Sequence, residues 1–193
     1  MTSSIKKVLE SLNLQKLLDF FADNAECLHI SRYHKEGYPT HCLLVIHQMM
    51  QEFQAGRTSE SALVAACLHD IAKPRTAALN KRNEACFYGH ENVTDEELAE
   101  FLAPSYPEFQ RVASLIRAHM LPMGIGEATP EPFRTQNQER LESVLAKEGE
   151  PFRSDLMILS SCDQSASVKN DADLGEAERI AEETRMILLS LNG

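Results

Sequence analysis

The chain has 193 residues, of which 43% are hydrophobic and 25% charged, and its formal net charge is −10. This composition is that of a globular protein long enough for one domain with a sizeable core. The acidic charge argues against a long nucleic acid as partner, and no apolar run is long enough to span a membrane. Five cysteines without a CxxC pair, and an N-terminus without a signal peptide, predict a reduced, cytoplasmic protein.

Apolar residues recur at helical spacing along most of the chain, and no alternating pattern persists that would predict a strand. Gly, Pro and short polar segments separate the helical stretches. The fold class predicted from this pattern is all-α. In chain order, the expected helices cover residues 4–23 (as one helix or two), about 41–54, 58 or 59 to about 70, 94–102, 107–120, about 136–148, 152–167 and 174–191.

Two of these helices carry recognisable start signals. Thr40 is the expected N-cap of the helix over 41–54, and the run from Thr94 to Glu97 resembles a capping box. Between helices, residues 72–92 are expected to be irregular. The segment 121–135 is expected to form a long loop with a functional role.

A titratable pair follows a very apolar helix near the middle of the chain. Residues 62–68 should be buried, and His69 and Asp70 come directly after them. Burying such groups without partners costs several kcal/mol. Partners elsewhere in the chain, or a metal ion, must therefore satisfy them.

Three other helices also turn a histidine or a carboxylate toward the core. His41, His119 and Asp163 each share a helix face with apolar residues. A single histidine on such a face is usually a hydrogen-bonded core residue, and a single aspartate often caps a neighbouring helix. Four such placements together favour a metal site, because imidazoles and carboxylates from separate helices are how helical bundles hold metal ions.

The order of these residues resembles that of the HD-domain metal-dependent phosphohydrolases over roughly residues 30–168. Four motifs are similar to those of one branch, the HD domains attached to bacterial tRNA nucleotidyltransferases and poly(A) polymerase-like proteins. These motifs are YHKEGYPTH (33–41), HDIAKP (69–74), FYGHE (87–91) and RAHMLP (117–122). Ala72 departs from the pattern, in which Gly is commoner. The resemblance implies a single HD-domain helical bundle over residues 1–193, with the N- and C-terminal helices packed on its core.

The resemblance also implies a ligand set for two divalent metal ions. Asp70 would bridge them, and His90 and His119 would complete the second site. The mixture of imidazole and carboxylate suits Fe, Mn, Co, Ni or Zn. His90 has an alternative reading as an exposed loop residue, while His29 and His47 have no such support and are expected to be structural or surface residues. The six implied ligands are His41, His69, Asp70, His90, His119 and Asp163.

Two such ions can share a water and lower its pKa toward ~7, so that the resulting hydroxide attacks a phosphorus. Asp70 and Lys73 are the expected catalytic residues, with Lys73 also contacting the substrate phosphate. Glu91 is expected to orient the imidazole of His90. The thiols of Cys67 and Cys162 should point away from the site. Further substrate contacts are expected from His34, Arg75 and Arg134.

The predicted function is therefore a metal-dependent phosphatase or phosphodiesterase, acting on a nucleotide or on a terminal or 2′,3′-cyclic nucleotide phosphate. Hydrolysis of a nucleoside triphosphate or a dinucleotide is the nearest alternative. A second alternative is a non-catalytic helical module that binds nucleotides and keeps the metal for stability. The net charge favours a small phosphorylated substrate over long RNA.

Overall fold

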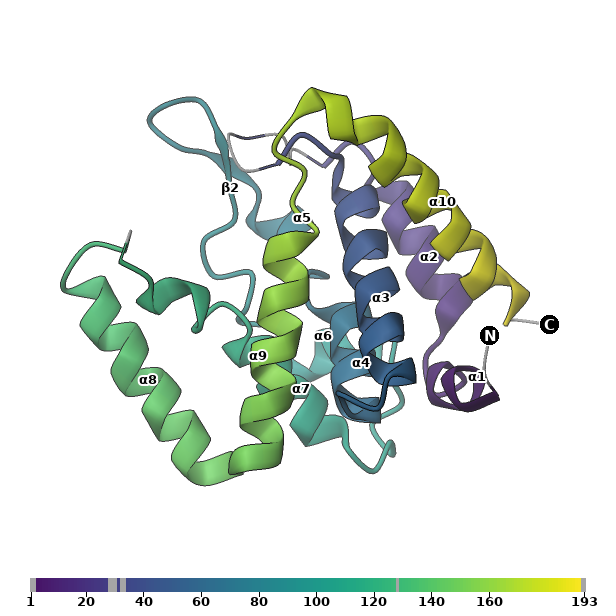
Figure 1. The fold of residues 1–193 in the computed structure, drawn as a ribbon, viewed down its shortest axis with the longest axis horizontal. Coiled ribbons are helices and arrows are strands. Elements are labelled where there is room, and N and C mark those ends of the chain that lie inside the picture. The colour runs from purple at the N-terminus through teal and green to yellow at the C-terminus, as the bar shows by residue number, and fades with distance from the viewer. Residues whose placement is uncertain (1–2, 28–30, 32–33, 128, 192–193) are drawn as a thin grey trace.

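Helices account for most of the residues that the computed structural model describes, which are 3–27, 31, 34–127 and 129–191. The all-α prediction is confirmed (Figure 1). In chain order, the helices are α1 (Ser3–Leu9), α2 (Leu14–Asp23), α3 (Tyr38–Gln54), α4 (Glu60–Leu68), α5 (Lys73–Thr76), α6 (Asp95–Ala99), α7 (Phe109–Ala118), the 3₁₀ helix η1 (Met123–Ile125), α8 (Phe133–Glu148), α9 (Glu150–Ser165), the 3₁₀ helix η2 (Asp171–Asp173) and α10 (Leu174–Ser190).

Helix starts follow local chemistry, with one correction. The side chain of Ser59 accepts a hydrogen bond from the backbone at the start of α4, and Thr94 and Glu97 form the predicted capping box of α6. The prediction that Thr40 caps α3 is wrong, because that helix begins at Tyr38. Pro39 lies in its first turn, where the fixed φ of proline suits a helix and its missing N–H costs nothing.

A small hairpin interrupts the segment that was expected to be irregular. Strands β1 (Ala78–Leu79) and β2 (Ala85–Cys86) pair antiparallel. The prediction that residues 72–92 are irregular is wrong at these strands, since two residues are too few to produce an alternating pattern. Asn80 closes the turn by accepting hydrogen bonds from the backbone N–H groups of Arg82 and Glu84.

Helix α4 is the centre of the bundle. Every residue from Ser61 to Leu68 is buried, and α3, α7 and α9 pack around it. Helix α10 packs along α3 and also contacts α2, while α1 contacts α3 and α4 (Figure 1). A helix enclosed in this way delivers the residues that follow it into the interior.

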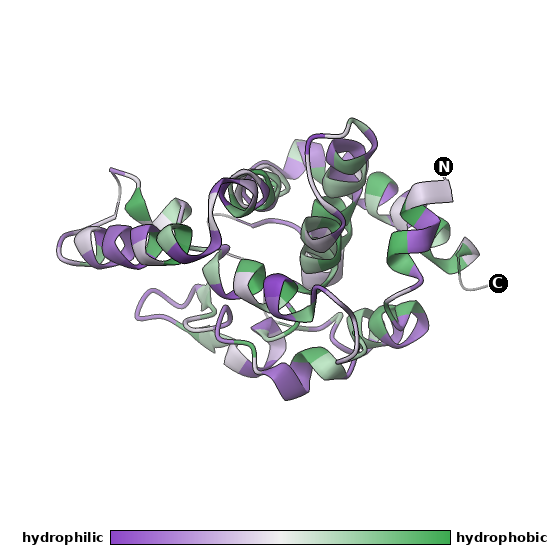
Figure 2. Ribbon diagram, turned by 90° about the horizontal axis from the view of Figure 1, so that it is seen from below, coloured by the Kyte–Doolittle hydropathy of each residue, from purple (hydrophilic) through white to green (hydrophobic). Residues whose placement is uncertain are grey.

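Helix α8 is more hydrophilic than the helices of the bundle (Figure 2). Hydrophobic residues lie mainly where the helices of the bundle face one another, whereas α8 projects to one side and is largely hydrophilic (Figure 2). Only Leu141 and Leu145 of α8 are buried, and it joins the fold through α9 and η1. Among the described residues, no helix combines the length and the apolarity that crossing a membrane requires.

Candidate metal centre

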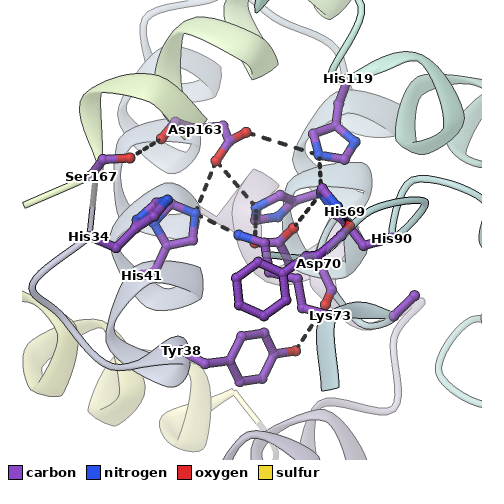
Figure 3. Close-up of polar contacts among 12 residues, drawn as sticks. His34, Tyr38, His41, His69, Asp70, Lys73, His90, His119, Asp163 and Ser167 are labelled. Atoms are coloured by element: carbon purple, nitrogen blue, oxygen red, sulfur yellow. Dashed lines mark hydrogen bonds and ion pairs between the residues drawn. The ribbon is translucent and has the colours of Figure 1, made fainter. Parts of the chain in front are cut away.

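The six predicted ligands meet at one place inside the bundle (Figure 3). His41 comes from the first turns of α3 and Asp163 from the last turn of α9. His69 and His119 are the residues that end α4 and α7, which allows their side chains to turn across the helix ends. All six are buried, and they arrive from five separate segments of the chain.

The first group of potential ligand atoms comes from His41, His69, Asp70 and Asp163, and these atoms lie within 4.8 Å of one another. His41 Nε2 is 2.9 Å from Asp163 Oδ1 and 3.5 Å from Asp70 Oδ2. His69 Nε2 is 3.1 Å from the same Asp70 oxygen. Two ligands that each lie about 2.1 Å from one ion are separated by about 3 to 3.5 Å, so these spacings fit a single cation.

The second group shares Asp70 with the first and adds His90 and His119. Here the other carboxylate oxygen faces the ligands, because His90 Nε2 is 3.4 Å from Asp70 Oδ1. The Nε2 atoms of the two histidines are 3.3 Å apart. His90 is buried, which excludes its alternative reading as an exposed loop residue. The two oxygens of Asp70 thus face two different sets of imidazoles.

Three of the imidazoles are held in one tautomer by the backbone. A carbonyl oxygen can only accept, so each Nδ1 must carry the hydrogen and each neutral ring presents an unprotonated Nε2 to the centre. Two such Nε2 atoms 3.3 Å apart repel unless a cation lies near both. In each case the Nδ1 donates to the carbonyl oxygen of the residue three positions earlier in the chain. The distances from Nδ1 to this oxygen are 2.8 Å for His69 and Ala66, 2.7 Å for His90 and Phe87, and 2.6 Å for His119 and Ile116.

Electrostatics keeps the two carboxylates and His119 in metal-binding protonation states. Burial alone would raise the pKa of Asp70, but the adjacent imidazole of His69 and the ammonium of Lys73 hold it well below its usual range. Burial is likewise outweighed at Asp163, where the hydrogen bond with His41 lowers the pKa. Burial, with a contribution from His90, lowers the pKa of His119 to about 4. Near neutral pH the carboxylates are therefore ionised and His119 is neutral.

Some buried polar atoms of this centre have no hydrogen-bond partner in the part of the chain that the structure describes, and this indicates whether a metal ion fits there. Asp70 Oδ1 and His69 Nε2 are fully buried and have no hydrogen-bond partner among the described residues. Leaving such atoms unmet costs about 1–3 kcal/mol each. A divalent cation held by the first group would satisfy His69 Nε2, and one held by the second group would satisfy Asp70 Oδ1. An imidazole and carboxylate donor set suits Fe, Mn, Co, Ni or Zn. The residues therefore fit one or two divalent ions.

Lys73 lies at the centre of the cluster. It is buried, and its Nζ is 2.7 Å from Asp70 Oδ2 and 5.3 Å from the centroid of the Phe87 ring. Burial would lower its pKa, but Asp70 and Asp163 raise it above the usual range. Tyr38 steadies the same segment by donating its hydroxyl to the carbonyl oxygen of Asp70 at 3.2 Å. Lys73 is therefore a cation placed directly beside the shared carboxylate.

The other predicted substrate contacts divide into one residue near the centre and two away from it. His34 is half-buried and packs edge-on against the ring of His41, with centroids 5.0 Å apart. Arg75 instead pairs with Glu97, and Arg134 pairs with Glu131 at 2.7 Å on α8 and the segment before it. The structure does not bring these two arginines to the cluster.

His47 and the thiols of Cys67 and Cys162 lie outside the cluster. His47 hydrogen bonds with Thr184 on α10, at 3.1 Å, as expected for a structural residue. Burial raises the pKa of Cys67 to about 12 and that of Cys162 to about 11, so both stay protonated. His29 lies outside the described residues.

Glu36 is a site residue that the sequence reading missed. It is fully buried, and its Oε1 is 2.7 Å from His34 Nδ1 and 3.3 Å from His41 Nδ1. Its Oε2 accepts the backbone N–H of Val168 at 3.0 Å. The carboxylate thus lies at ion-pair distance from the His41 nitrogen that faces away from the centre, the position where the other three imidazoles meet a backbone carbonyl. The sequence signal was its place within the motif YHKEGYPTH (33–41), between two histidines.

Glu91, which the sequence suggested as the residue orienting His90, does not have that geometry. Its carboxylate is 3.9 Å from His90 Nδ1, and the Phe87 carbonyl already takes the hydrogen of that nitrogen. Glu36→Gln is therefore expected to weaken metal binding about 10- to 100-fold, while Glu91→Gln leaves it unchanged. Isothermal titration with Mn²⁺ or Zn²⁺ measures both variants. Equal affinities in the two variants would show that Glu36 does not orient His41.

Comparison with protein families gives one match. The family model described as HD domain matches residues 26–164, from just beyond α2 to the last turn of α9. This range covers most of the chain and contains all six predicted ligands. Comparison with curated proteins and with solved structures found no match.

Proposed function

The chain belongs to the HD domain family, and we propose that it is a metal-dependent phosphohydrolase that acts on a nucleotide or on a terminal or 2′,3′-cyclic nucleotide phosphate. Family membership supports metal-dependent hydrolysis in general. One observation carries the proposal for this chain, which is that the two oxygens of Asp70 face two separate sets of imidazole nitrogens. A carboxylate shared in this way is what a two-metal centre requires.

The proposal assigns the first ion to His41, His69, Asp70 and Asp163, and the second to Asp70, His90 and His119. Divalent ions held by these residues would lower the pKa of a bound water and polarise phosphoryl oxygens, and would so supply a nucleophile without a serine or cysteine. The protein holds the imidazoles in one tautomer and keeps the carboxylates ionised. The burial of these side chains also keeps bulk water away from the reacting groups.

In this proposal, Lys73 supplies a positive charge to the phosphate of the substrate. Its raised pKa keeps it cationic, and Asp70 positions it. A fixed cation at this point stabilises negative charge that develops on a phosphoryl group. Asp70 and Lys73 are thus the two residues assigned a catalytic role, one through the metal ions and one through the substrate.

The proposed substrate is small. A net charge of −10 disfavours long RNA, and the resemblance of four motifs to those of the HD domains attached to tRNA nucleotidyltransferases is the support for a 2′,3′-cyclic phosphate. Nucleoside triphosphates and dinucleotides are the alternatives. The test is hydrolysis of bis-p-nitrophenyl phosphate, 2′,3′-cyclic nucleotides, nucleoside mono- and triphosphates and dinucleotides, each with added Mn²⁺, Co²⁺ or Ni²⁺. If the protein hydrolyses none of these compounds when its metal sites are filled, the phosphohydrolase proposal is wrong and the chain is a non-catalytic binding module.

Lys73→Met is expected to keep the metal and lose turnover. The methionine fills the same space, and removing a positive charge 2.7 Å from Asp70 also removes a repulsion that opposes metal binding. Metal affinity should therefore stay the same or rise, while kcat/KM falls about 10²- to 10³-fold. Metal content and turnover are measured on the same preparation. Loss of metal in step with activity would assign Lys73 to the support of the metal ligands instead.

A further inference from the structure

A cavity of about 320 Å³ opens beside the metal centre. Its lining comes from the loop around Gly89, the segment that follows α7, the 3₁₀ helix η1 and α8. This is where α8 stands out from the bundle in Figure 1. His90 is the link between the two places, because it lines the cavity while its Nε2 is 3.4 Å from Asp70 Oδ1. A phosphate at the centre and an organic group in the cavity would lie on either side of one imidazole.

We propose that this cavity binds the nucleoside of the substrate, with the base against Tyr88, an inference that rests on the phosphohydrolase function proposed above. Tyr88 is 84% exposed, although a large aromatic side chain usually finds cover in a folded protein. Met120, Leu121 and Met123 add an apolar, adaptable wall. A flat aromatic ring with flexible apolar neighbours suits a planar base, and any of the nucleobases can stack on such a ring.

The polar residues of the cavity fit the rest of a nucleoside. Asn137 donates its side-chain N–H to the carbonyl oxygen of Gly124 at 3.1 Å, which fixes the amide and leaves its Oδ1 as an acceptor for a base edge. Arg117 is occupied by Asp95 at 2.6 Å. Arg140 brings a second cation, and no ion pair joins it to another of the described residues. A phosphate ester without a base would use none of these groups except the arginine.

The size of the cavity selects among the substrates left open above. A volume of about 320 Å³ is at the lower end of the range for small-molecule sites. It therefore favours one nucleoside over two, and so a mononucleotide over a dinucleotide. The anionic part of that substrate would extend past His90 toward Lys73.

The test compares a nucleoside monophosphate, or its 2′,3′-cyclic form, with the corresponding ribose phosphate that lacks the base. Tyr88→Ala is expected to lower the ratio of the two kcat/KM values by about tenfold or more. The matched control is Phe133→Ala, which removes an aromatic side chain that is 61% exposed but does not line the cavity, and it should leave the ratio unchanged. An unchanged ratio in Tyr88→Ala, with metal content intact, would overturn the inference.

A binding measurement separates this inference from the proposed function. Adenosine carries no phosphate, so its titration against the wild-type protein followed by NMR reports on the cavity alone. Shifts near residues 88 and 140 that disappear in Tyr88→Ala would support the cavity even if no phosphate ester is hydrolysed. If the protein hydrolyses nucleotides but does not bind adenosine, and Tyr88→Ala leaves the ratio of the two kcat/KM values unchanged, the nucleoside site is rejected. The phosphohydrolase function would still stand.

Discussion

Asp70→Asn is expected to remove both metal ions and to lower kcat/KM by at least about 10³-fold. Each oxygen of this carboxylate faces a different set of imidazole nitrogens, at 3.1 Å for His69 and 3.4 Å for His90. The amide keeps the shape of the side chain but loses the negative charge and one of the two acceptor atoms. Metal content by elemental analysis and turnover of a nucleotide substrate measure the two effects.

The stability of this variant needs a control. Asp70→Asn leaves the ammonium of Lys73 buried without its anionic partner, which is strongly destabilising. The double variant Asp70→Asn/Lys73→Met removes both charges and should recover the lost stability without recovering metal. Retention of two ions per chain in either variant would show that Asp70 does not bridge them.

Asp155→Ala is expected to lower the free energy of unfolding by about 3–5 kcal/mol. Its buried carboxylate holds the start of α4 by accepting from Thr58 Oγ1 at 3.0 Å, Ser59 N at 3.0 Å and Ser59 Oγ at 2.6 Å. It also accepts from Arg111 Nη2 at 2.8 Å, so it joins α9 to α4 and α7. Alanine leaves that guanidinium partly buried beside the Phe152 ring with no carboxylate.

Urea unfolding monitored by circular dichroism measures this loss. Asp155→Asn keeps an acceptor for the N-terminus of α4 but not the charge for Arg111, so its loss should be smaller. Arg179→Ala breaks exposed ion pairs on α10 and should change stability little. A loss at Asp155→Ala no larger than that at Arg179→Ala would contradict the role given to this carboxylate.

Helical periodicity was enough to predict the inward placement of three of the proposed ligands. His41, His119 and Asp163 each lie on a face of apolar residues, and burial of that face in the bundle turns them toward α4. His90 lies on a loop, where periodicity gives no direction. Only its resemblance to a family motif suggested a place at the centre, and the structure puts it there.

Other features depended on contacts between distant segments and could not be seen in the sequence. Glu36 binds Val168, 132 positions away, and nothing near it in the chain indicates that contact. Arg75 looked available for phosphate, but its partner Glu97 lies on α6, which folds back against it. A lysine or arginine near a motif in the sequence can bind substrate only if it forms no ion pair with a carboxylate elsewhere in the fold.

The most direct test of the two-metal centre is elemental analysis of metal-loaded protein, wild type beside His90→Ala. The two sets of ligand atoms around Asp70 predict two divalent ions per chain in the wild type and one in the variant, since the group formed by His41, His69, Asp70 and Asp163 stays intact. A single ion per chain in the wild type, unchanged by His90→Ala, would contradict the shared role of Asp70.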